Sequence, residues 1–576
     1  MIKFVLNILD HKQKLLLIAL IIFSLISSIV EVAGIASVYP MIQILLDDDI
    51  LNNEIYLKYF SNIFSSKNQL LYFSLITIFL IFLLKNLIVF FVKYLQFSFA
   101  YKLKVDILKK LSRGILFLPF SQLSKKTTDE NLRNFDFVNE FPSVVAFLLI
   151  IFTETSLLLF IIFFLFLISP KMLFIVLIFL GLSLSLIYKS QKNVFYNLGD
   201  KHQFIKKNYM KNILELIRGM REIKIMKKEN IFINRISKTL KNLGKIRFKS
   251  DVLLQIPAHL IEIIVILSIV LIVYILYQQN LSELEIASIM GSFVIAFVRL
   301  MPSSTRILSS LNALKYQLPQ TKILFKEFNI ENYQRQTAEK KRETLINLKK
   351  SVRIKNLNFS YTGRKKVLNN LNFEVKKGQC IGIYGSSGQG KTTFNNLISG
   401  LLTPNNGEIF VDDLNIIKTN TNWSKKVAYI PQTPFFLNGS IIENITFFSE
   451  KKIIKRKVIN SLKNSGLYNS VINLPKKLNT IIGEDGNKLS TGQLQRLSIA
   501  RALYLESDLI ICDEATNSLD AENEKVVLNS LNKLKQKGKT IIIISHDVRV
   551  FYFCDKIFKL KDGNLINVKK SSLLKN

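Results

Sequence analysis

Cysteine is scarce in this sequence. Its 576 residues include 3 cysteines, Cys380, Cys512 and Cys554, all in the C-terminal third. Three is an odd number, and none of them lies in a segment that we expect outside the cytoplasm. The sequence therefore contains no cysteine framework of the kind that stabilises small secreted domains.

Acidic residues are also few relative to basic ones. The chain has 42 Asp and Glu against 78 Lys and Arg, which gives a net charge of +36 and a pI of about 9.8. Such an excess is typical of nucleic-acid-binding proteins, but also of membrane proteins with basic cytoplasmic loops. The length is too great for one core, so we expect two or more domains.

The N-terminus lacks a small-residue cleavage site. Residues 1–14 carry charges before a long apolar run, so we interpret them as retained and not as a removed signal peptide. Hydrophobic residues make up 49% of the chain and crowd into its first half. They predict six membrane spans, at residues 15–46, 70–92, 141–168, 172–188, 253–277 and 284–308.

The loops between the spans differ in charge. Residues 189–251 hold 17 Lys and Arg against 5 Asp and Glu, and residues 93–140 hold 9 against 5. The opposite connections are short and acidic, with Asp47, Asp48, Asp49 and Glu54 in one and Glu283 and Glu285 in another. The positive-inside rule places the long loops and both termini in the cytoplasm. The basic excess is thus largely topological, and we expect no nucleic-acid partner.

The long inner loops have apolar residues at helical spacing, so we expect membrane helices continued into the cytosol, with turning points at residues 127–137 and 227–234. Between the first two spans, residues 55–64 form either a short amphipathic helix on the membrane surface or an ordinary folded loop. Residues 325–350 lack a sustained apolar run and are typical of a linker. Beyond them strand and helix patterns alternate. The predicted domains are a membrane domain at 1–324, the linker, and an α/β domain at 351–576.

One glycine-rich stretch organises the second domain. Cys380–Ile383 has the pattern of a buried strand, residues 384–392 follow as Y-G-S-S-G-Q-G-K-T, and a helix pattern begins at Thr393. Strand, loop and helix N-terminus are the context in which G-x-x-x-x-G-K-[ST] binds nucleotide phosphates. Lys391 suits the phosphates and the Thr392 hydroxyl suits Mg²⁺. We predict phosphate-binding positions at Gly385, Ser386, Ser387, Gly388, Gly390, Lys391, Thr392 and Thr393.

Two acids end a second strand pattern. Asp513 and Glu514 follow the apolar run 509–512. The carboxyl ends of strands are where ligands bind in α/β proteins. Asp513 fits a Mg²⁺-orienting role, and Glu514 fits a general base that activates water.

Residues 489–493, L-S-T-G-Q, resemble the signature of the ATP-binding-cassette family, except that the family usually has glycine where this chain has Thr491. The resemblance implies nucleotide contacts from Ser490, Gly492 and Gln493, and we expect Thr491 to change the rate of hydrolysis more than abolish it. Other stretches are similar to the family in the same order. The resemblance implies adenine stacking by Tyr361, Mg²⁺ sensing by Gln432, an interface position at Asp520, and γ-phosphate contact by His546.

The resemblance covers nearly the whole chain. It implies a fold of six transmembrane helices in the type IV exporter arrangement, followed by a C-terminal α/β P-loop ATPase domain. It implies ATP and Mg²⁺ as cofactors, and a half-transporter that acts as a homodimer because one cassette cannot complete its own site. Amino-acid usage rich in Lys, Asn and Ile suggests a bacterial inner membrane.

The substrate is the most open question. Arg299 and Arg306 flank Pro302 in the sixth span, and Lys85 and Glu31 lie in the second and first spans. Ionisable groups at membrane depth mark function, and guanidinium suits phosphate. Alternatively the arginines reach the interface, or pair with Glu31 or Glu262 for packing. Residues 297–307 resemble the bacterial lipid-linked oligosaccharide flippases, which implies a polyprenyl-pyrophosphate glycan as substrate. The alternative is a multidrug, peptide or lipid A exporter.

Overall fold

The computed structural model describes residues 5–46, 64–123, 127–279, 283–327 and 344–570, apart from residues 8, 65, 362–365, 420, 448, 450–452 and 518. It divides into two compact units, described separately here. The first contains Met1–Leu118 and Lys125–Gln336, and the second contains Pro119–Ser124 and Thr337–Asn576. The proposed surface helix at 55–64 lies outside the described residues except for Phe64, as do Asp47, Asp48, Asp49 and Glu54.

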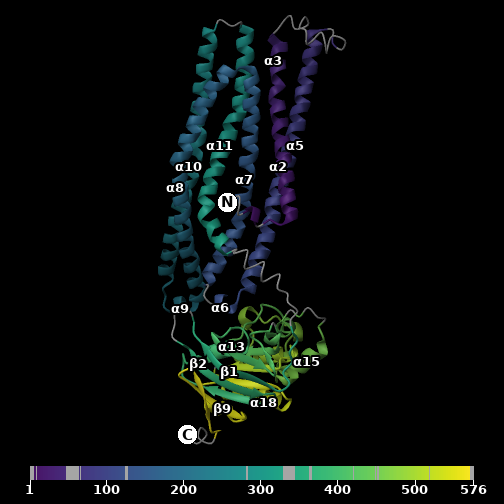
Figure 1. Ribbon diagram of the computed structural model, residues 1–576, viewed down its shortest axis with the longest axis vertical. Coiled ribbons are helices and arrows are strands. Elements are labelled where there is room, and N and C mark those ends of the chain that lie inside the picture. The colour runs from purple at the N-terminus through teal and green to yellow at the C-terminus, as the bar shows by residue number, and fades with distance from the viewer. Residues whose placement is uncertain are drawn as a thin grey trace. The chain divides into compact units, whose positions relative to one another are not determined.

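The first unit is helical, and its long helices run side by side (Figure 1). Six of its described segments are long and apolar enough to cross a membrane, as the sequence predicts. The first span is two helices that meet at Ser37, and Pro40 lies in the first turn of the second, where a missing N–H is tolerated. The helices are α2 (His11–Ala36), α3 (Val38–Leu46), α5 (Lys67–Phe117), α7 (Thr128–Ile168), α8 (Pro170–Arg218), α9 (Met220–Ile225), α10 (Glu229–Gln278) and α11 (Glu283–Glu327).

The helices continue well past the apolar segments, as expected, but the predicted turning points are wrong in detail. Thr127 is the N-cap of α7, with Glu130 completing a capping box, so residues 128–137 are already helical. The second turn is confined to residues 226–228, where Lys227 has a positive φ of 51°, and α10 begins at Glu229. Apolar periodicity carries through both places. A capping box marks the start of α7, and a residue of positive φ precedes α10.

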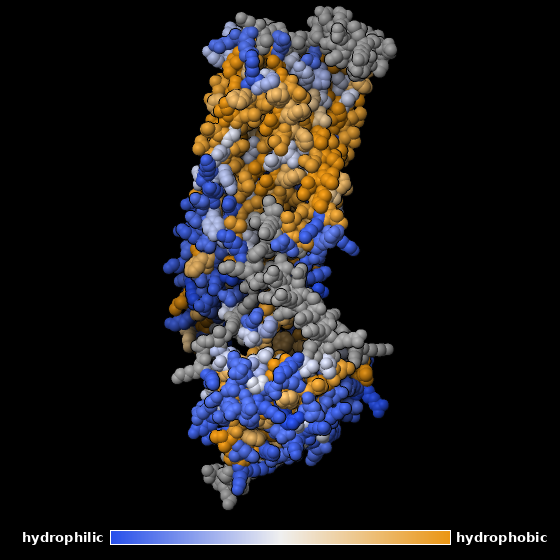
Figure 2. Space-filling view, in the orientation of Figure 1, coloured by the Kyte–Doolittle hydropathy of each residue, from blue (hydrophilic) through white to orange (hydrophobic). Residues whose placement is uncertain are grey.

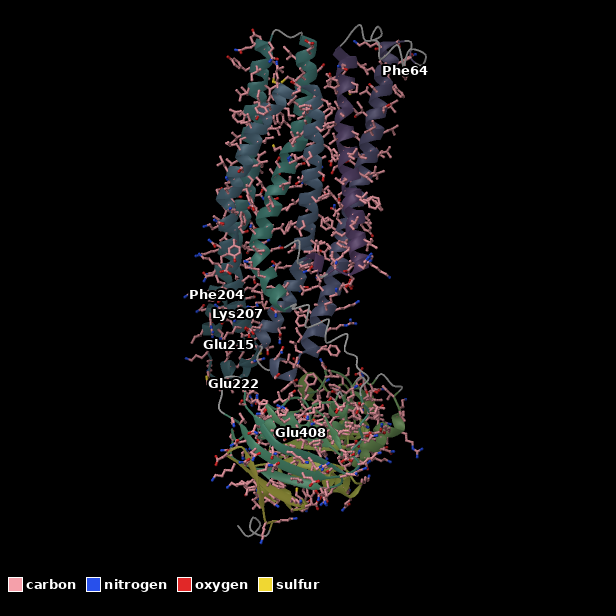
Figure 3. All side chains as sticks on the ribbon, in the orientation of Figure 1. Phe64, Phe204, Lys207, Glu215, Glu222 and Glu408 are labelled. Carbon is pink, nitrogen blue, oxygen red and sulfur yellow. The ribbon has the colours of Figure 1, made fainter. Side chains whose placement is uncertain are left out.

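The surface of the first unit changes character along its length. Hydrophobic side chains cover most of the surface of the long helices in this view, and hydrophilic side chains gather towards the end of the unit that carries α9 (Figure 2). Phe204, Lys207 and Glu215 lie on this far part of α8 (Figure 3). Several ion pairs join its helices there. Among them, Lys207 lies 3.5 Å from Glu130 of α7, and Glu215 lies 2.9 Å from Arg235 of α10. These helical ends therefore carry paired, charged side chains suited to contact with water, as expected of helices that continue beyond the apolar segments.

The second unit contains two sheets. A four-stranded antiparallel sheet has the order β2-β1-β4-β5, and a six-stranded sheet has the order β10-β9-β3-β8-β7-β6. In the second sheet β9, β3, β8, β7 and β6 are parallel, so the residues that follow β3, β8 and β7 share one edge. The strands are β1 (Ser351–Phe359), β2 (Leu368–Lys376), β3 (Cys380–Tyr384), β4 (Asn406–Val411), β5 (Leu414–Asn415), β6 (Val427–Ile430), β7 (Leu509–Asp513), β8 (Thr540–Ile544), β9 (Lys556–Lys561) and β10 (Asn564–Val568).

Helices pack around these sheets. They are α6 (Phe120–Leu123), α13 (Lys391–Ile398), α14 (Ile441–Thr446), α15 (Lys455–Asn464), α16 (Tyr468–Ile472), α17 (Thr491–Tyr504) and α18 (Ala521–Gln536). The core between the sheets includes Ile346 and Leu348, which are 3% and 2% exposed. The end of the segment interpreted as a linker is therefore part of the folded unit. Most of that segment, residues 328–343, lies outside the described residues.

Candidate functional site

The glycine-rich loop connects β3 to α13, in the predicted strand, loop and helix order. Gly390, the N-cap of α13, has a φ of 100°, and Gly388 has a φ of 83°. An added Cβ at Gly390 would lie 2.9 Å from Val367 Cγ1, so strain and crowding both favour glycine there. The helix N-terminus beyond the loop carries partial positive charge that favours an anion.

Lys391 joins the loop to two other predicted residues. Its amine donates to the Gly385 carbonyl over 2.8 Å, lies 2.7 Å from His546 Nε2, and lies 3.4 Å from Glu514 Oε1. His546 Nε2 and Glu514 Oε1 are 2.8 Å apart. The Lys391 side chain is 8% exposed, whereas that of Glu514 is 24% exposed. One buried cation thus holds the predicted base and the predicted γ-phosphate contact together.

Asp513 has a partner that the sequence analysis did not identify. The Tyr429 hydroxyl donates to Asp513 Oδ2 over 2.7 Å from the neighbouring strand β6. Burial and this bond to the carboxylate raise the pKa of Tyr429, so it is a neutral donor at physiological pH. Tyr429 stands three residues before Gln432 in the sequence. Nothing in single-sequence pattern distinguishes it from an ordinary strand aromatic.

Lys391, Tyr429, Asp513 and Glu514 line a cavity of about 510 Å³. That volume falls within the range of small-molecule sites. The cavity receives hydroxyls from Thr392 and Thr393, and Tyr361 reaches Thr393 Oγ1 over 3.2 Å. Its lining contains most of the predicted positions: Tyr361, Ser387, Gly388, Gly390, Lys391, Thr392, Thr393, Gln432, Asp513 and Glu514. The predicted Gly385, Ser386 and His546 are not part of the lining, and His546 reaches it only through its contacts with Lys391 and Glu514.

The signature residues lie elsewhere in the unit. Ser490 caps α17, with Gln493 at the third helical position completing a capping box. Neither they nor Gly492 and Asp520 line the cavity. Gly492 packs tightly, since an added Cβ would lie 2.7 Å from Asn523, whose amide donates to Asp520 over 2.6 Å. Ser490, Gly492, Gln493 and Asp520 are therefore ordered in one chain without joining its nucleotide cavity.

Thr491 is the first residue of α17, and its side chain is exposed. Five residues beyond the Ser490 cap, the buried Gln495 donates to the backbone carbonyls of Pro431 and Gln432 over 3.2 and 2.7 Å. The signature helix is thereby bonded to the backbone of the Gln432 loop. Sequence reasoning missed Gln495, which has the pattern of an ordinary helical position.

The cavity fits a magnesium nucleotide. A basic amine, two threonine hydroxyls, a glutamine and two carboxylates converge on a helix N-terminus, as such a ligand needs. Thr392, Gln432 and Asp513 are the side chains that would hold Mg²⁺, which neutralises charge that develops on phosphate oxygens. Among the described residues no group of three or more His, Cys, Asp or Glu forms a metal site by itself.

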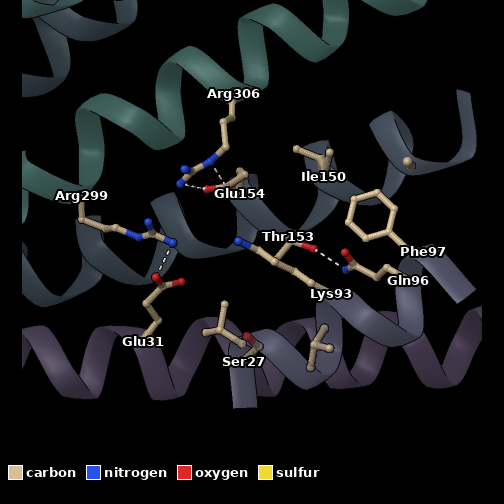
Figure 4. Close-up of a pocket in the computed structure, with 13 residues that line it drawn as sticks. Ser27, Glu31, Lys93, Gln96, Phe97, Ile150, Thr153, Glu154, Arg299 and Arg306 are labelled. Atoms are coloured by element: carbon tan, nitrogen blue, oxygen red, sulfur yellow. Dashed lines mark hydrogen bonds and ion pairs between the residues drawn. The ribbon is translucent and has the colours of Figure 1, made fainter. Parts of the chain in front are cut away.

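A second cavity of about 210 Å³ lies within the first unit, between α2, α5, α7 and α11. Arg299 forms an ion pair with Glu31, and Arg306 forms one with Glu154, with Nε and Oε1 2.6 Å apart (Figure 4). The alternative in which the arginines pair with carboxylates is therefore correct for Glu31. Glu262 instead faces His259 at 4.0 Å on its own helix.

Lys85 is not the cavity's lysine. Its amine lies 3.9 Å from the centre of the Phe82 ring, and it does not line the cavity. Lys93, two helical turns further along α5, lines it instead. The sequence analysis proposed only Lys85, and Lys93 directly follows the predicted second span at 70–92. Helix packing, and not the sequence pattern, places Lys93 at the cavity. Glu154, the partner of Arg306, was also missed because an isolated span carries no sign of its neighbour.

Comparison with known proteins agrees with this geometry. Residues 368–517 match the family model described as ABC transporter. The lactococcin-G-processing and transport ATP-binding protein LagD of Lactococcus lactis subsp. lactis is 31% identical over 360 residues, 62% of this chain and 50% of LagD. The alpha-hemolysin translocation ATP-binding protein HlyB of Escherichia coli is 36% identical over 229 residues, 39% of this chain and 32% of HlyB. The chain thus matches a third to a half of these relatives' lengths.

The fold has a close structural counterpart. A bacterial Atm1-family ABC exporter with ATP bound superposes with a TM-score of 0.79 at 18% identity, covering 98% of this chain and 97% of that chain. The chain therefore has six apolar helices followed by an α/β ABC ATPase domain, a domain that binds ATP with Mg²⁺ as its usual partner ion. It is a multi-pass membrane protein.

Proposed function

We propose that the chain is a half-transporter that dimerises with a second copy and uses ATP to move an amphipathic substrate out of the cytoplasm or across the bilayer. One observation carries this proposal. Lys391 and Glu514 line one cavity and both contact His546, whereas Ser490 and Gly492 do not line that cavity. A second chain would supply those signature residues to close the site, so two copies would form two equivalent composite sites.

The residues take distinct roles at such a site. Glu514 accepts a proton from the attacking water, and His546 and Lys391 contact the γ-phosphate. Asp513, Thr392 and Gln432 orient Mg²⁺, and Tyr361 stacks on adenine. Because Lys391 is paired with Glu514 here, an incoming phosphate competes for the lysine and frees the carboxylate to act as a base. ATP binding thereby favours the closed dimer, and hydrolysis reopens it.

Amino-acid usage rich in Lys, Asn and Ile supports a bacterial inner-membrane location. The charge of the loops supports placing both termini and the ATPase domain in the cytoplasm. The helices that continue past the apolar segments, α5, α7, α8 and α10, are the elements that would carry closure to the membrane. Domains at 1–324 and 351–576 divide this work between transport and hydrolysis.

The favoured substrate is a polyprenyl-pyrophosphate oligosaccharide. A charged cavity among apolar helices supports it, because Arg299, Arg306 and Lys93 offer cations to a phosphate at membrane depth. The lipid tail would lie among membrane lipids and the apolar helix surfaces. Glu31 and Lys85 remain candidates near this path, although Lys85 lies outside the cavity lining.

A peptide or toxin exporter is the second candidate. LagD is named for the processing and transport of lactococcin G, and HlyB for the translocation of alpha-hemolysin. Both proteins resemble this chain. A multidrug or lipid A exporter has the same architecture. A pump for an uncharged peptide or drug has no need of Arg299, so its transport survives Arg299→Met combined with Glu31→Gln, which removes the pair without leaving Glu31 as an unpaired buried charge.

Transfer of a fluorescent polyprenyl-pyrophosphate oligosaccharide across proteoliposomes tests the proposal. We expect ATP-dependent transfer by the wild type and none by Glu514→Gln or by Arg299→Met combined with Glu31→Gln. ATPase activity without transfer by the wild type would reject this substrate and favour the peptide or drug alternative.

A further inference from the structure

Two ion pairs join α11 to two other helices inside the membrane cavity (Figure 4). Arg299 pairs with Glu31 of α2, and Arg306 pairs with Glu154 of α7 through Nε–Oε1 at 2.6 Å and Nη2–Oε2 at 3.1 Å. The arginines are about two helical turns apart, so they lie on one face of α11. These pairs tie one helix to both of its neighbours across the cavity.

Both carboxylates are nearly inaccessible. The side chains of Glu31 and Glu154 are 11% and 8% exposed, whereas those of Arg299 and Arg306 are 24% and 37% exposed. A buried charge that loses its partner is strongly destabilising. The two pairs therefore resist separation of α11 from α2 and α7 unless another anion replaces the carboxylates.

A third cation reaches the same cavity. The Lys93 side chain points into the space between the two pairs (Figure 4), and no hydrogen bond or ion pair joins it to another described residue. Three cations thus meet two carboxylates at the lining. Lys93 adds the one positive charge that the internal pairs leave unbalanced, so the cavity attracts a further anion.

We propose that Glu31 and Glu154 are placeholder carboxylates: they hold the arginines until an anionic head group replaces them, and the replacement frees α11 from α2 and α7. This inference rests on the proposed function for the identity of the head group. Phosphate oxygens match the guanidinium fork as well as carboxylate oxygens do, so the exchange keeps each arginine paired. Lys93 contacts the head group first, before either pair opens.

The exchange provides a reason for substrate to stimulate ATP hydrolysis. A ligand shifts a conformational equilibrium only when it binds one state better than the other. Here the head group gains its arginine contacts only in the state in which α11 is released. Substrate therefore favours the released state. Replacing Glu31 and Glu154 with neutral side chains should favour the same state even when no substrate is present.

The test measures the ATPase rate of the full chain in phosphatidylcholine nanodiscs against added undecaprenyl pyrophosphate, the only anionic lipid present. The test variant is Glu31→Gln with Glu154→Gln, which keeps side-chain shape and removes both charges. Without added lipid, we expect the ATPase rate of this variant to exceed the wild-type rate by at least about fivefold, which is the lower end of the usual coupling between two sites. Added undecaprenyl pyrophosphate should then raise the rate of the variant little further. Glu262→Gln is the matched control, because Glu262 also lies in a span but outside the cavity.

An unchanged rate and an unchanged lipid dependence in the double variant would overturn the exchange. If wild type is stimulated and the double variant behaves like it, the exchange fails and the proposed substrate stands. If wild type is not stimulated but the double variant is activated, the proposed substrate fails and release of α11 stands.

Should the double variant not fold, the swap Glu154→Arg with Arg306→Glu restores a pair. Lost stimulation in the folded swap supports the exchange, and wild-type stimulation overturns it.

Discussion

The Lys391 amine lies 3.4 Å from the Glu514 carboxylate. The two residues follow β3 and β7, which flank β8 in the parallel sheet, and His546 follows β8 itself. Three adjacent strands thus deliver a cation, a histidine and an acid to one edge. The strand order, and not proximity in sequence, assembles the site.

Replacing the predicted base separates binding from hydrolysis. Glu514→Gln should lower the ATPase rate by about 10²–10⁴-fold, the usual contribution of a general base. Binding of a fluorescent ATP analogue should persist, because Lys391 keeps its Gly385 and His546 contacts. Glu374→Gln, on the exposed face of β2, is the control. A Glu514→Gln protein that hydrolyses ATP at the wild-type rate removes Glu514 from the base role.

Tyr429→Phe tests whether Tyr429 positions Asp513. The variant removes the 2.7 Å hydrogen bond from Tyr429 to Asp513 Oδ2. A hydrogen bond to a charged acceptor contributes about 1.5–3 kcal/mol, so Asp513 would be held less firmly in its position. We expect a several-fold higher Mg²⁺ concentration at half-maximal ATPase rate, with nucleotide binding in EDTA unchanged. Tyr552→Phe, which loses a comparable bond to Asn529, is the matched control. Equal Mg²⁺ dependence in both variants contradicts the positioning role.

Gly492→Ala tests the tight packing behind the signature. The new Cβ would lie 2.7 Å from Asn523, so Asn523 and its bond to Asp520 must shift. Overpacking of this kind should lower the free energy of unfolding by about 1–3 kcal/mol and reduce the ATPase rate. Gly244→Ala is the control, since no atom lies within 4 Å of its added Cβ in α10. Thermal midpoints that fall equally for both variants would reject this explanation.

Asp412 should make the ATPase domain's stability depend on pH. Burial acts to raise its pKa, but backbone N–H donors from Lys350, Lys349 and Ser351, at 2.7–3.0 Å, outweigh burial and lower the pKa. Such a carboxylate stabilises the fold above its unfolded pKa of about 3.9, and the contribution disappears as the pH falls through the lower folded value.

The corresponding variant is Asp412→Asn. It should lower the free energy of unfolding at pH 7 by about 1–2 kcal/mol, a reduced value because the carboxylate is partly exposed to water. The thermal midpoint of the full chain against pH measures this. We expect the difference from wild type to shrink as the pH falls below 4. A difference that grows in acid would contradict the pKa direction.

The sequence predicts the nucleotide site better than the membrane cavity for a physical reason. Phosphate binding needs a local loop whose glycines and lysine are adjacent in the chain, so Gly390 and Lys391 identify it without knowledge of the fold. The pairing of Arg306 with Glu154 joins two helices 152 residues apart. Apolar periodicity gives each helix and its burial, but not which helix lies beside it.

The same limit explains the smaller differences. Lys85 and Lys93 both lie on α5, and only packing selects Lys93 for the cavity. Tyr429 and Gln495 act through neighbours on other elements. The turn at Thr127 depends on a capping box, and the turn at Lys227 depends on a residue with a positive φ. Apolar periodicity does not detect either feature.

The central claim is that two chains complete each other's nucleotide sites. Lys391→Ala chains lack the phosphate-binding lysine, and Ser490→Arg chains lack the signature contact, so each variant alone should be inactive. Co-expressed and purified together, a mixed dimer contains one composite site with an intact loop from one chain and an intact signature from the other. We predict that the mixture recovers ATPase activity. Activity no greater than the sum of the two separate variants would contradict the composite site.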